Sequence, residues 1–348
     1  MNKLGAFIEG VSRKNKEEKD IPVYSVSNKG FCTEYFSKNV ASLDTSSYKI
    51  VRQGEFAYNP SRINVGSVDY LRNASEALVS PLYIVFTVSE DIDKDYLLLY
   101  LKSPVVLDKI NRRAKGGVRN NLKLESLKDF EINFPSLEKQ KIIVNVVNSI
   151  RSIIANRENV IQKYNELERS LFFERFGDPK TNPKGIPEIK FIDLVTLQRG
   201  FDLPVSHRSG TGFPVYGSNG VLGFHSEFKS ENGIITGRSG TIGKVEYCEG
   251  KFWPLNTTLF SLDLHGNNPV FIKHFMEYYD LSRFFRGSGV PTLNRNDVHP
   301  MMVMNPSLEE QNSFASSIKA IEKAKKQANF QLNKLRSLEN SQIRKFFL

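Results

Sequence analysis

The sequence predicts an α+β protein in which two β-rich mixed domains are separated by a pair of long antiparallel coiled-coil helices. Three observations predict this architecture. PSLEKQ at 135–140 returns as PSLEEQ at 306–311, an offset of 171 residues. Apolar residues follow each copy at the alternating 3–4 spacing of a coiled coil. Short Val-, Ile- and Tyr-rich runs separated by Gly, Asn, Ser and Pro precede each copy, as in strands joined by turns.

The repeat extends well beyond that hexapeptide. PVYSVSNKGFCTEYF at 22–36 resembles FPVYGSNGVLGFHSEF at 213–228, and VGSVDY at 65–70 resembles IGKVEY at 242–247. The matches run in the same order in both halves, which indicates an internal repeat with an approximate two-fold axis. We therefore expect a first domain over 1–135, a long helix over 136–176, a linker over 177–190, a second domain over 191–305 and a second long helix over 306–348.

The two long helices are predicted from their apolar spacing and from their ends. Ser136 is placed to cap the first helix, and Gly177 with Pro179 is placed to end it. Ser307 followed by Glu310 forms a capping box at the start of the second. At 1.5 Å per residue each helix would be about 60 Å long. The predicted coiled-coil seam consists of Ile143, Val146, Ile150, Ile153, Val160, Tyr164, Leu167 and Leu171 in the first helix, and Phe314, Ile321, Ala324, Ala328, Leu335 and Leu338 in the second.

Within the domains, the segments 95–113 and 268–285 have the spacing of amphipathic helices near the end of each domain. The segment 177–190 is polar and contains three prolines, which predicts a linker.

Composition sets the broad class of protein. The 348 residues are 40% hydrophobic and contain no apolar run that approaches the roughly 18 residues of a membrane span. No export signal is readable at the N-terminus, and two cysteines cannot build a disulfide framework, so a cytoplasmic location is expected. The 48 basic and 38 acidic residues give a net charge of +10, which favours a polyanionic partner.

The sequence predicts no catalytic or metal site. The glycine-rich run 237–244 lacks the Ser or Thr that follows Gly-Lys in a phosphate-binding loop. Tyr58-Asn59-Pro60-Ser61 lacks the second proline and the aromatic residue of an amino-methyltransferase loop. Glu188-Ile189-Lys190 with Asp178 upstream lies in the predicted linker, where a nuclease site is not expected. The five histidines have no metal-ligand spacing.

Clusters of Arg, Lys, Asn and Ser in glycine-rich loops are the remaining candidates. NRRAKGGVRNNLK at 111–123 contains five basic residues and no acid, and FFRGSGVPTLNRND occupies the corresponding place in the second half. Arg and Asn pair bidentately with guanine and adenine, while glycine lets the backbone approach phosphate. A solvated polar turn explains any single loop equally well, but two such loops at equivalent positions favour a nucleic-acid interface.

These residues carry a resemblance to a known family. FPVYGSNGVLGFHSEF, GIITGRSGTIGKVEYCEGKFWPLNTTLF and RGSGVPTLNRNDVHPMMVMNPSLEEQ resemble the target recognition domain and conserved helix of type I restriction-modification specificity subunits. The resemblance covers nearly the whole chain. The first half resembles a more diverged copy, because residues 60–64 read Pro-Ser-Arg-Ile-Asn where the second half has Gly-Arg-Ser-Gly-Thr.

The resemblance implies a non-enzymatic subunit that reads a bipartite DNA site with an unspecified spacer. It implies two methyltransferase partners, docked on the long helices, which carry S-adenosylmethionine while this chain holds no cofactor, and a motor-endonuclease subunit that joins through them. The DNA-binding residues expected in the first half are Ser27, Asn28, Lys29, Arg62, Asn64, Arg112, Arg113, Lys115, Arg119 and Asn120. Those expected in the second half are Ser218, Asn219, Arg238, Thr241, Lys244, Arg286, Thr292, Asn294, Arg295 and Asn296.

Two other functions remain open on the sequence. A stand-alone DNA methyltransferase or nuclease could use the same reading domains, although the S-adenosylmethionine and metal motifs are missing. A coiled-coil scaffold with two protein-binding domains would leave the positive charge without a role. Salt-dependent binding to random duplex distinguishes a DNA-binding protein from such a scaffold.

Overall fold

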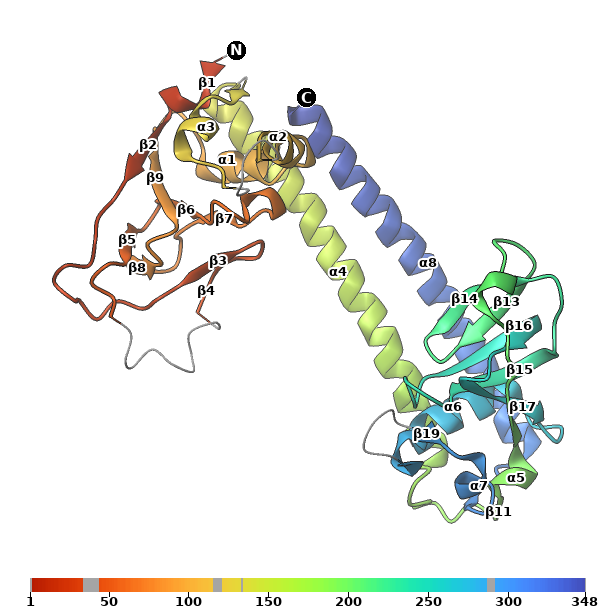
Figure 1. The fold of residues 1–348 in the computed structure, drawn as a ribbon. Coiled ribbons are helices and arrows are strands. Elements are labelled where there is room, and N and C mark those ends of the chain that lie inside the picture. The colour runs from red at the N-terminus through yellow and green to blue at the C-terminus, as the bar shows by residue number, and fades with distance from the viewer. Residues whose placement is uncertain (1, 34–43, 115–120, 133, 287–291, 348) are drawn as a thin grey trace. The chain divides into compact units, whose positions relative to one another are not determined.

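The computed structural model describes residues 2–33, 44–114, 121–132, 134–286 and 292–347. The chain divides into two compact units (Figure 1). The first unit comprises residues 1–157 and 331–348, and the second comprises residues 158–330. Each of the two long helices, α4 (Leu137–Phe176) and α8 (Leu308–Phe347), therefore contributes one part to each unit. None of the helices that the structure describes is long and apolar enough to span a membrane.

The first unit contains short antiparallel strands arranged in one sheet of four strands and three pairs. The sheet has the order β2-β9-β6-β7, and the pairs are β1-β10, β3-β4 and β5-β8. The strands are β1 (Asn2–Lys3), β2 (Ile8–Val11), β3 (Ser25–Ser27), β4 (Gly30–Cys32), β5 (Lys49–Arg52), β6 (Phe56–Tyr58), β7 (Val68–Tyr70), β8 (Glu76–Val79), β9 (Ile84–Val88) and β10 (Glu131–Ile132).

Helices cover this sheet and join it to the long helices. They are two 3₁₀ turns, η1 (Leu4–Ala6) and η3 (Ile63–Val65), and the helices α1 (Lys94–Leu101), α2 (Pro104–Ala114) and α3 (Leu124–Lys128). Helices α1, α2 and α3 lie beside the first turns of α4 (Figure 1). Their apolar side chains form one core with Val147 of α4 and with Phe347 of α8, whose ring lies 5.3 Å from that of Tyr96.

The single helix predicted over 95–113 is two helices. The chain breaks at Lys102 and Ser103, because Pro104 cannot donate a backbone hydrogen bond and starts the next helix. The Ser103 hydroxyl then accepts a bond from the Val106 amide at 3.3 Å, which caps α2.

The second unit is built on a six-stranded sheet of order β12-β17-β15-β16-β13-β14. All neighbours are antiparallel except β13 and β16, which run parallel. Two strand pairs, β11-β20 and β18-β19, flank this sheet. The strands are β11 (Glu188–Lys190), β12 (Thr196–Arg199), β13 (Phe213–Gly217), β14 (Gly220–His225), β15 (Ser230–Gly237), β16 (Val245–Pro254), β17 (Thr258–Asp263), β18 (Phe285–Arg286), β19 (Thr292–Leu293) and β20 (Met302–Met304).

Helices pack on one face of that sheet and form an aromatic core with the long helices. They are α5 (Phe191–Leu194), η4 (Val205–His207), α6 (Pro269–Tyr279), η5 (Leu281–Phe284) and α7 (Arg295–Val298). Phe172 of α4 lies 5.7 Å from Phe314 of α8 and 6.1 Å from Phe271 of α6, measured between ring centroids. The helix predicted over 268–285 ends at Tyr279, since Asp280 has a φ of 62° and a 3₁₀ turn follows. The last residues of the predicted linker form β11.

The predicted ends of the long helices are confirmed. The Lys139 amide donates to the Ser136 hydroxyl at 3.4 Å, and Gly177 adopts a φ of 75° at the end of α4. In α8 the Glu310 amide donates to Ser307 Oγ at 3.3 Å while the Ser307 amide donates to Glu310 Oε2 at 2.9 Å. This is the reciprocal capping box that the sequence predicted.

The repeated PSLE-x-Q motif forms the same joint in each unit. Gln140 is buried, and its amide nitrogen donates to Pro135 O at 2.9 Å while its oxygen accepts from the Asp93 amide at 2.9 Å. Gln311 is buried likewise: it donates to Pro306 O at 2.9 Å and accepts from the Asn268 amide at 2.9 Å. Asp93 and Asn268 are the N-caps of α1 and α6. We call this joint the glutamine latch.

The long helices do not bury the whole predicted seam. Val146, Ile153, Leu167 and Leu338 are 39%, 48%, 44% and 44% exposed, so these four positions of the prediction are wrong. In α4 the neighbouring Val147 is fully buried, and the buried position next to Leu167 is Glu168. Glu168 tolerates burial because its carboxylate accepts from Lys325 of α8 at 3.0 and 3.3 Å. The buried face of α4 therefore contains an ion pair, and a search for apolar spacing does not find such a position.

Candidate nucleic-acid interface

In the first unit, the predicted residues Ser27, Asn28 and Lys29 form the turn of the β3-β4 hairpin. Gly30 closes that turn with a φ of 108°, a conformation that favours glycine. Ser27 Oγ accepts from the Lys29 amide at 3.1 Å, and the Asn28 carbonyl accepts from Lys102 Nζ at 3.1 Å. The side chains of Asn28 and Lys29 are exposed at the tip of the hairpin.

The loop with Arg62 and Asn64 lies next to this hairpin. A Cβ atom added to Gly66 would lie 3.9 Å from the Asn28 Cβ, which places the two turns side by side. Asn64 Nδ2 donates to the side-chain oxygen of Asn111 on α2 at 3.1 Å, and Arg62 is exposed. Three predicted segments, around 28, 62 and 111, therefore come together.

The two arginines of α2 differ in what they contact. Arg113 donates to the Ser126 carbonyl at 2.9 Å, and its guanidinium lies 4.6 Å from the centroid of the Phe130 ring. These contacts hold α3 against α2, so Arg113 supports the fold. Arg112 is exposed. Lys115, Arg119 and Asn120 lie outside the described residues.

In the second unit, Ser218 and Asn219 form the turn of the β13-β14 hairpin. Lys244 Nζ donates to the Asn219 carbonyl at 3.0 Å and forms an ion pair with Glu246. Lys244 thus holds the turn in place, and Glu246 offsets part of its charge. Sequence reasoning missed Glu246 and Lys102, which secure the two hairpin turns from strand β16 and from the end of α1. Their sequence neighbourhoods carry no signal for this contact.

The glycine-rich loop after β15 packs directly behind that hairpin. A Cβ atom on Gly237 would lie 1.7 Å from the Thr241 carbonyl oxygen, and one on Gly240 would lie 3.4 Å from Ser218 Oγ. Only glycine allows the first approach. The carbonyl of Arg238 accepts from the Leu293 amide at 2.8 Å, and Ser239 forms an isolated bridge with Thr292. Segments 218–219, 237–244 and 292–293 therefore converge.

The last predicted segment, 294–296, begins α7. The Asn294 side chain accepts from the Asn296 amide at 3.0 Å and caps the helix. Arg295 donates to the Leu197 carbonyl at 3.4 Å, and Arg238 donates to the Asn256 carbonyl at 3.3 Å. Both arginines keep other guanidinium nitrogens for an outside acceptor. The side chain of Arg286 lies outside the described residues.

Cys248 and Tyr216, which lie behind the second hairpin, are both protonated at neutral pH and are therefore weak nucleophiles. Burial raises the pKa of the Cys248 thiol, so the thiol is protonated at neutral pH. Burial also raises the pKa of the neighbouring Tyr216 phenol. In the described part of the chain, no cluster of three or more His, Cys, Asp or Glu is placed to hold a metal ion.

Each unit therefore presents a hairpin turn, a second loop and a polar segment at one place, with exposed Asn and Lys or Arg side chains. Residues 8–169 match the model of the type I restriction modification DNA specificity domain. The match confirms the resemblance inferred from the sequence, and it lies in the half that resembles the more diverged copy.

Solved structures share the fold over the whole chain. One, from work on complex assembly and conformational transition of the type I R-M system, has a TM-score of 0.63 and 14% identity and covers 99% of this chain and 96% of its own. The type I restriction-modification S subunit from M. genitalium has a TM-score of 0.59 and 16% identity and covers 100% and 95%. At such identities the likeness shows a common fold. No curated protein matches the sequence.

Proposed function

We propose that this chain is the DNA-reading specificity subunit of a type I restriction-modification complex, and that each unit reads one part of a bipartite target. The observation that carries the proposal is the specificity-domain match over 8–169, together with a second unit that brings equivalent loops together. The net charge of +10 agrees with a polyanionic ligand. Two separate readers leave the bases between their half-sites uncontacted, so the target contains an unspecified spacer.

The proposed reading residues lie in the converging loops. In the first unit these are the exposed Asn28, Lys29 and Arg62. In the second they are the exposed Asn219 and Lys244 and the half-buried Arg238 and Arg295. Arg and Asn supply base-edge contacts in the major groove, and Lys supplies contacts to phosphate.

We propose further that two methyltransferase subunits dock on the long helices and bring S-adenosylmethionine, and that a motor-endonuclease subunit joins through them. Exposed apolar side chains on both helices support this docking. Ile142 and Ile153 of α4 and Phe330 of α8 are about half exposed or more. Exposed apolar side chains gathered on one element are typical of protein interfaces.

Methylome sequencing of the host, with and without this gene, tests the proposal. The expected result is one methylated motif that disappears with the gene and consists of two short specified blocks around an unspecified gap. A continuous motif would contradict the bipartite reading. Methylation or cleavage of plasmid by the purified chain alone, with Mg²⁺ and S-adenosylmethionine, would instead establish a stand-alone enzyme.

A further inference from the structure

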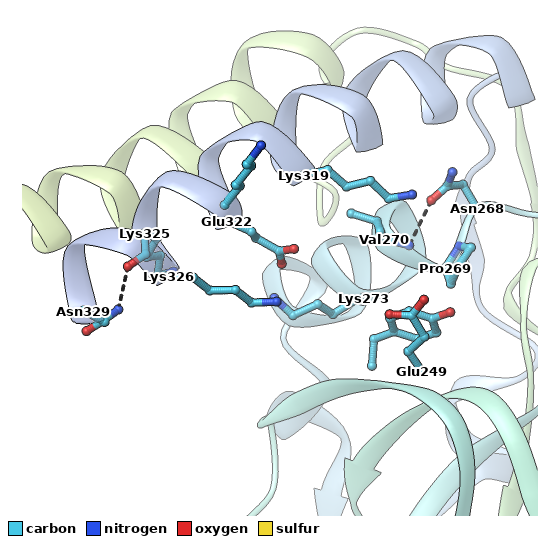
Figure 2. A pocket seen from close by; sticks show the side chains of 12 residues that line it. Glu249, Asn268, Pro269, Val270, Lys273, Lys319, Glu322, Lys325, Lys326 and Asn329 are labelled. Carbon is cyan, nitrogen blue, oxygen red and sulfur yellow. Dashed lines mark hydrogen bonds between the residues drawn. The ribbon is translucent and has the colours of Figure 1, made fainter. Parts of the chain in front are cut away.

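A lysine-rich cleft of about 760 Å³ lies in the second unit, away from the loops described above (Figure 2). Its walls are α6, α8 and strand β16. Tyr247 and Val270 contribute apolar surface, while five lysines and two glutamates, Glu249 and Glu322, supply the charges. The cleft is therefore an open, lysine-rich hollow that also contains two carboxylates and a partly apolar wall.

Three of the five lysines have no acidic partner. Lys325 pairs with Glu168 at 3.0 Å and Lys273 with Glu277 at 3.7 Å. Lys319, Lys323 and Lys326 form no ion pair with any of the residues that the structure describes. Glu249 and Glu322 offset part of this charge, and the remaining positive charge lies in a concave surface, which attracts an anion more strongly than a convex one.

The unpaired lysines form a regular row on α8. Their spacing of four and then three residues places them on one face of the helix, over about 10 Å of its length. Figure 2 shows Lys326 extending from α8 and Lys273 from α6 into the cleft, where the Glu322 carboxylate also points. The cleft therefore brings side chains of both helices to one place.

The row is absent from the other half of the repeat. The offset of 171 residues aligns Lys319, Lys323 and Lys326 with Asn148, Ser152 and Ala155. The first unit forms its corresponding latch and helix contacts without these lysines, so the repeated fold does not require them. Their function is therefore specific to the second half.

We propose that the lysine cleft binds consecutive phosphate groups of duplex DNA and so extends the DNA contact of the second unit. This inference rests on the proposed function. Consecutive phosphates of one strand advance 3.4 Å along the duplex axis and lie farther apart along the backbone, so a row of about 10 Å faces two or three of them. Lysine is a compact point charge that suits phosphate. In sequence, the cleft is also close to the proposed reading loops, because Lys244 directly precedes strand β16, and Tyr247 of that strand lines the cleft.

Salt titration of DNA binding by the full chain tests the cleft, with the charge-removing variant K319Q/K323Q/K326Q. The matched control is K139Q/K141Q/K163Q, which removes three exposed lysines from α4 and changes the net charge equally. The probe is random duplex DNA between 50 and 200 mM salt. The slope of log K against log salt should become shallower by about 2.7, so the affinity loss over this range should be about 40-fold smaller than for the wild type. In the control variant, the slope should change by less than a third of the change expected for the cleft variant.

Sequence discrimination separates this inference from the proposed function. The ratio of affinities for target and random duplex should be the same in the cleft variant and the wild type, because phosphate contacts carry no base information. An unchanged salt slope in the cleft variant would overturn the inference even if the wild type discriminates its target. Failure of the wild type to discriminate would instead count against the proposed function. A cleft variant that keeps its slope but no longer binds the methyltransferase subunit would show that the cleft takes an acidic protein.

Discussion

Lys244 shows how one side chain serves the fold and the proposed interface together. Its ammonium group donates to the Asn219 carbonyl and pairs with Glu246, which fixes the hairpin turn in front of it. Arg238 also combines a fold contact with a proposed DNA contact, since the half-buried side chain donates to the Asn256 carbonyl at 3.3 Å. At this scale a substitution changes both local order and DNA contact, so each test needs a control for folding.

Arg238→Ala should weaken DNA binding through the second half-site only. A bidentate arginine–guanine pair contributes about 1–3 kcal/mol of discrimination, so a loss of roughly 10- to 100-fold is expected for the intact target. Competition with targets in which each block is scrambled in turn measures the effect. Arg169→Ala, on the exposed face of α4, is the control. Loss of discrimination at the first block would contradict the assignment.

Protonation of the buried His274 ring should lower the unfolding free energy of the protein in mild acid. The ring is almost fully buried against Phe314, and this desolvation, with the charge of Lys273, lowers its pKa to about 4. The unfolded chain, with a pKa near 6.5, binds the proton more readily, so the stabilisation is complete above about pH 6.5 and is lost as the pH falls toward 4. The expected loss in unfolding free energy is on the order of 3 kcal/mol.

Denaturant titrations at pH 7 and pH 5 measure the part of this loss that falls between those two pH values, about 2 kcal/mol. His274→Phe keeps an aromatic ring in the core and removes the titrating group, so its stability should change less between these two pH values. Equal pH dependence in the variant and the wild type would show that other groups cause the loss.

At the scale of elements, the glutamine latch joins the start of each long helix to the helix that packs on it. Gln311→Ala should lower the unfolding free energy by about 2–4 kcal/mol, because buried partners of the amide lose their hydrogen bonds. Gln327→Ala, at an exposed position of the same helix, is the matched control and should change stability by less than about 0.5 kcal/mol. Chemical denaturation gives both values, and equal losses would rule out a stabilising latch.

The face that α4 buries can be tested with two adjacent valines. Val147→Ala should cost about 2 kcal/mol, since it removes buried methyl groups from a packed core. Val146→Ala should cost much less, because Val146 is exposed in this chain. Thermal unfolding measures both variants. A larger loss of stability for Val146→Ala than for Val147→Ala would instead support the seam predicted from the sequence.

The helices show which features can be read from a sequence. Their ends were predictable because caps depend on residues within one turn, as Ser307 and Glu310 illustrate. The buried face was predictable only in part, because α4 packs on its own domain as well as on α8 and buries Glu168 in an ion pair. The proposed reading loops were selected by composition, but their convergence depends on contacts such as Lys244 to Asn219, which no local pattern contains.

At the scale of the whole molecule, the proposed reading of one half-site by each unit would make DNA binding depend on the length of the spacer. Inserting five base pairs into the gap turns one half-site by about half a helical turn, so both units cannot engage together. Binding should fall toward that of a single half-site, whereas changing the gap sequence at constant length should leave affinity unchanged. Gel-shift titrations with both target series measure this. Tolerance of the insertion would mean that the units read independently.

The glutamine latch also bears on how such proteins could diversify. In both halves the amide binds the carbonyl of the motif's proline and the backbone N–H of an N-cap residue earlier in the chain, Asp93 of α1 or Asn268 of α6. A different domain with an Asp or Asn N-cap at that position would satisfy the glutamine latch, so it would join the same long helix without further changes at the latch. Under the proposed function, recombination at the glutamine latch would then change the DNA target in one step, while the long helices stayed the same.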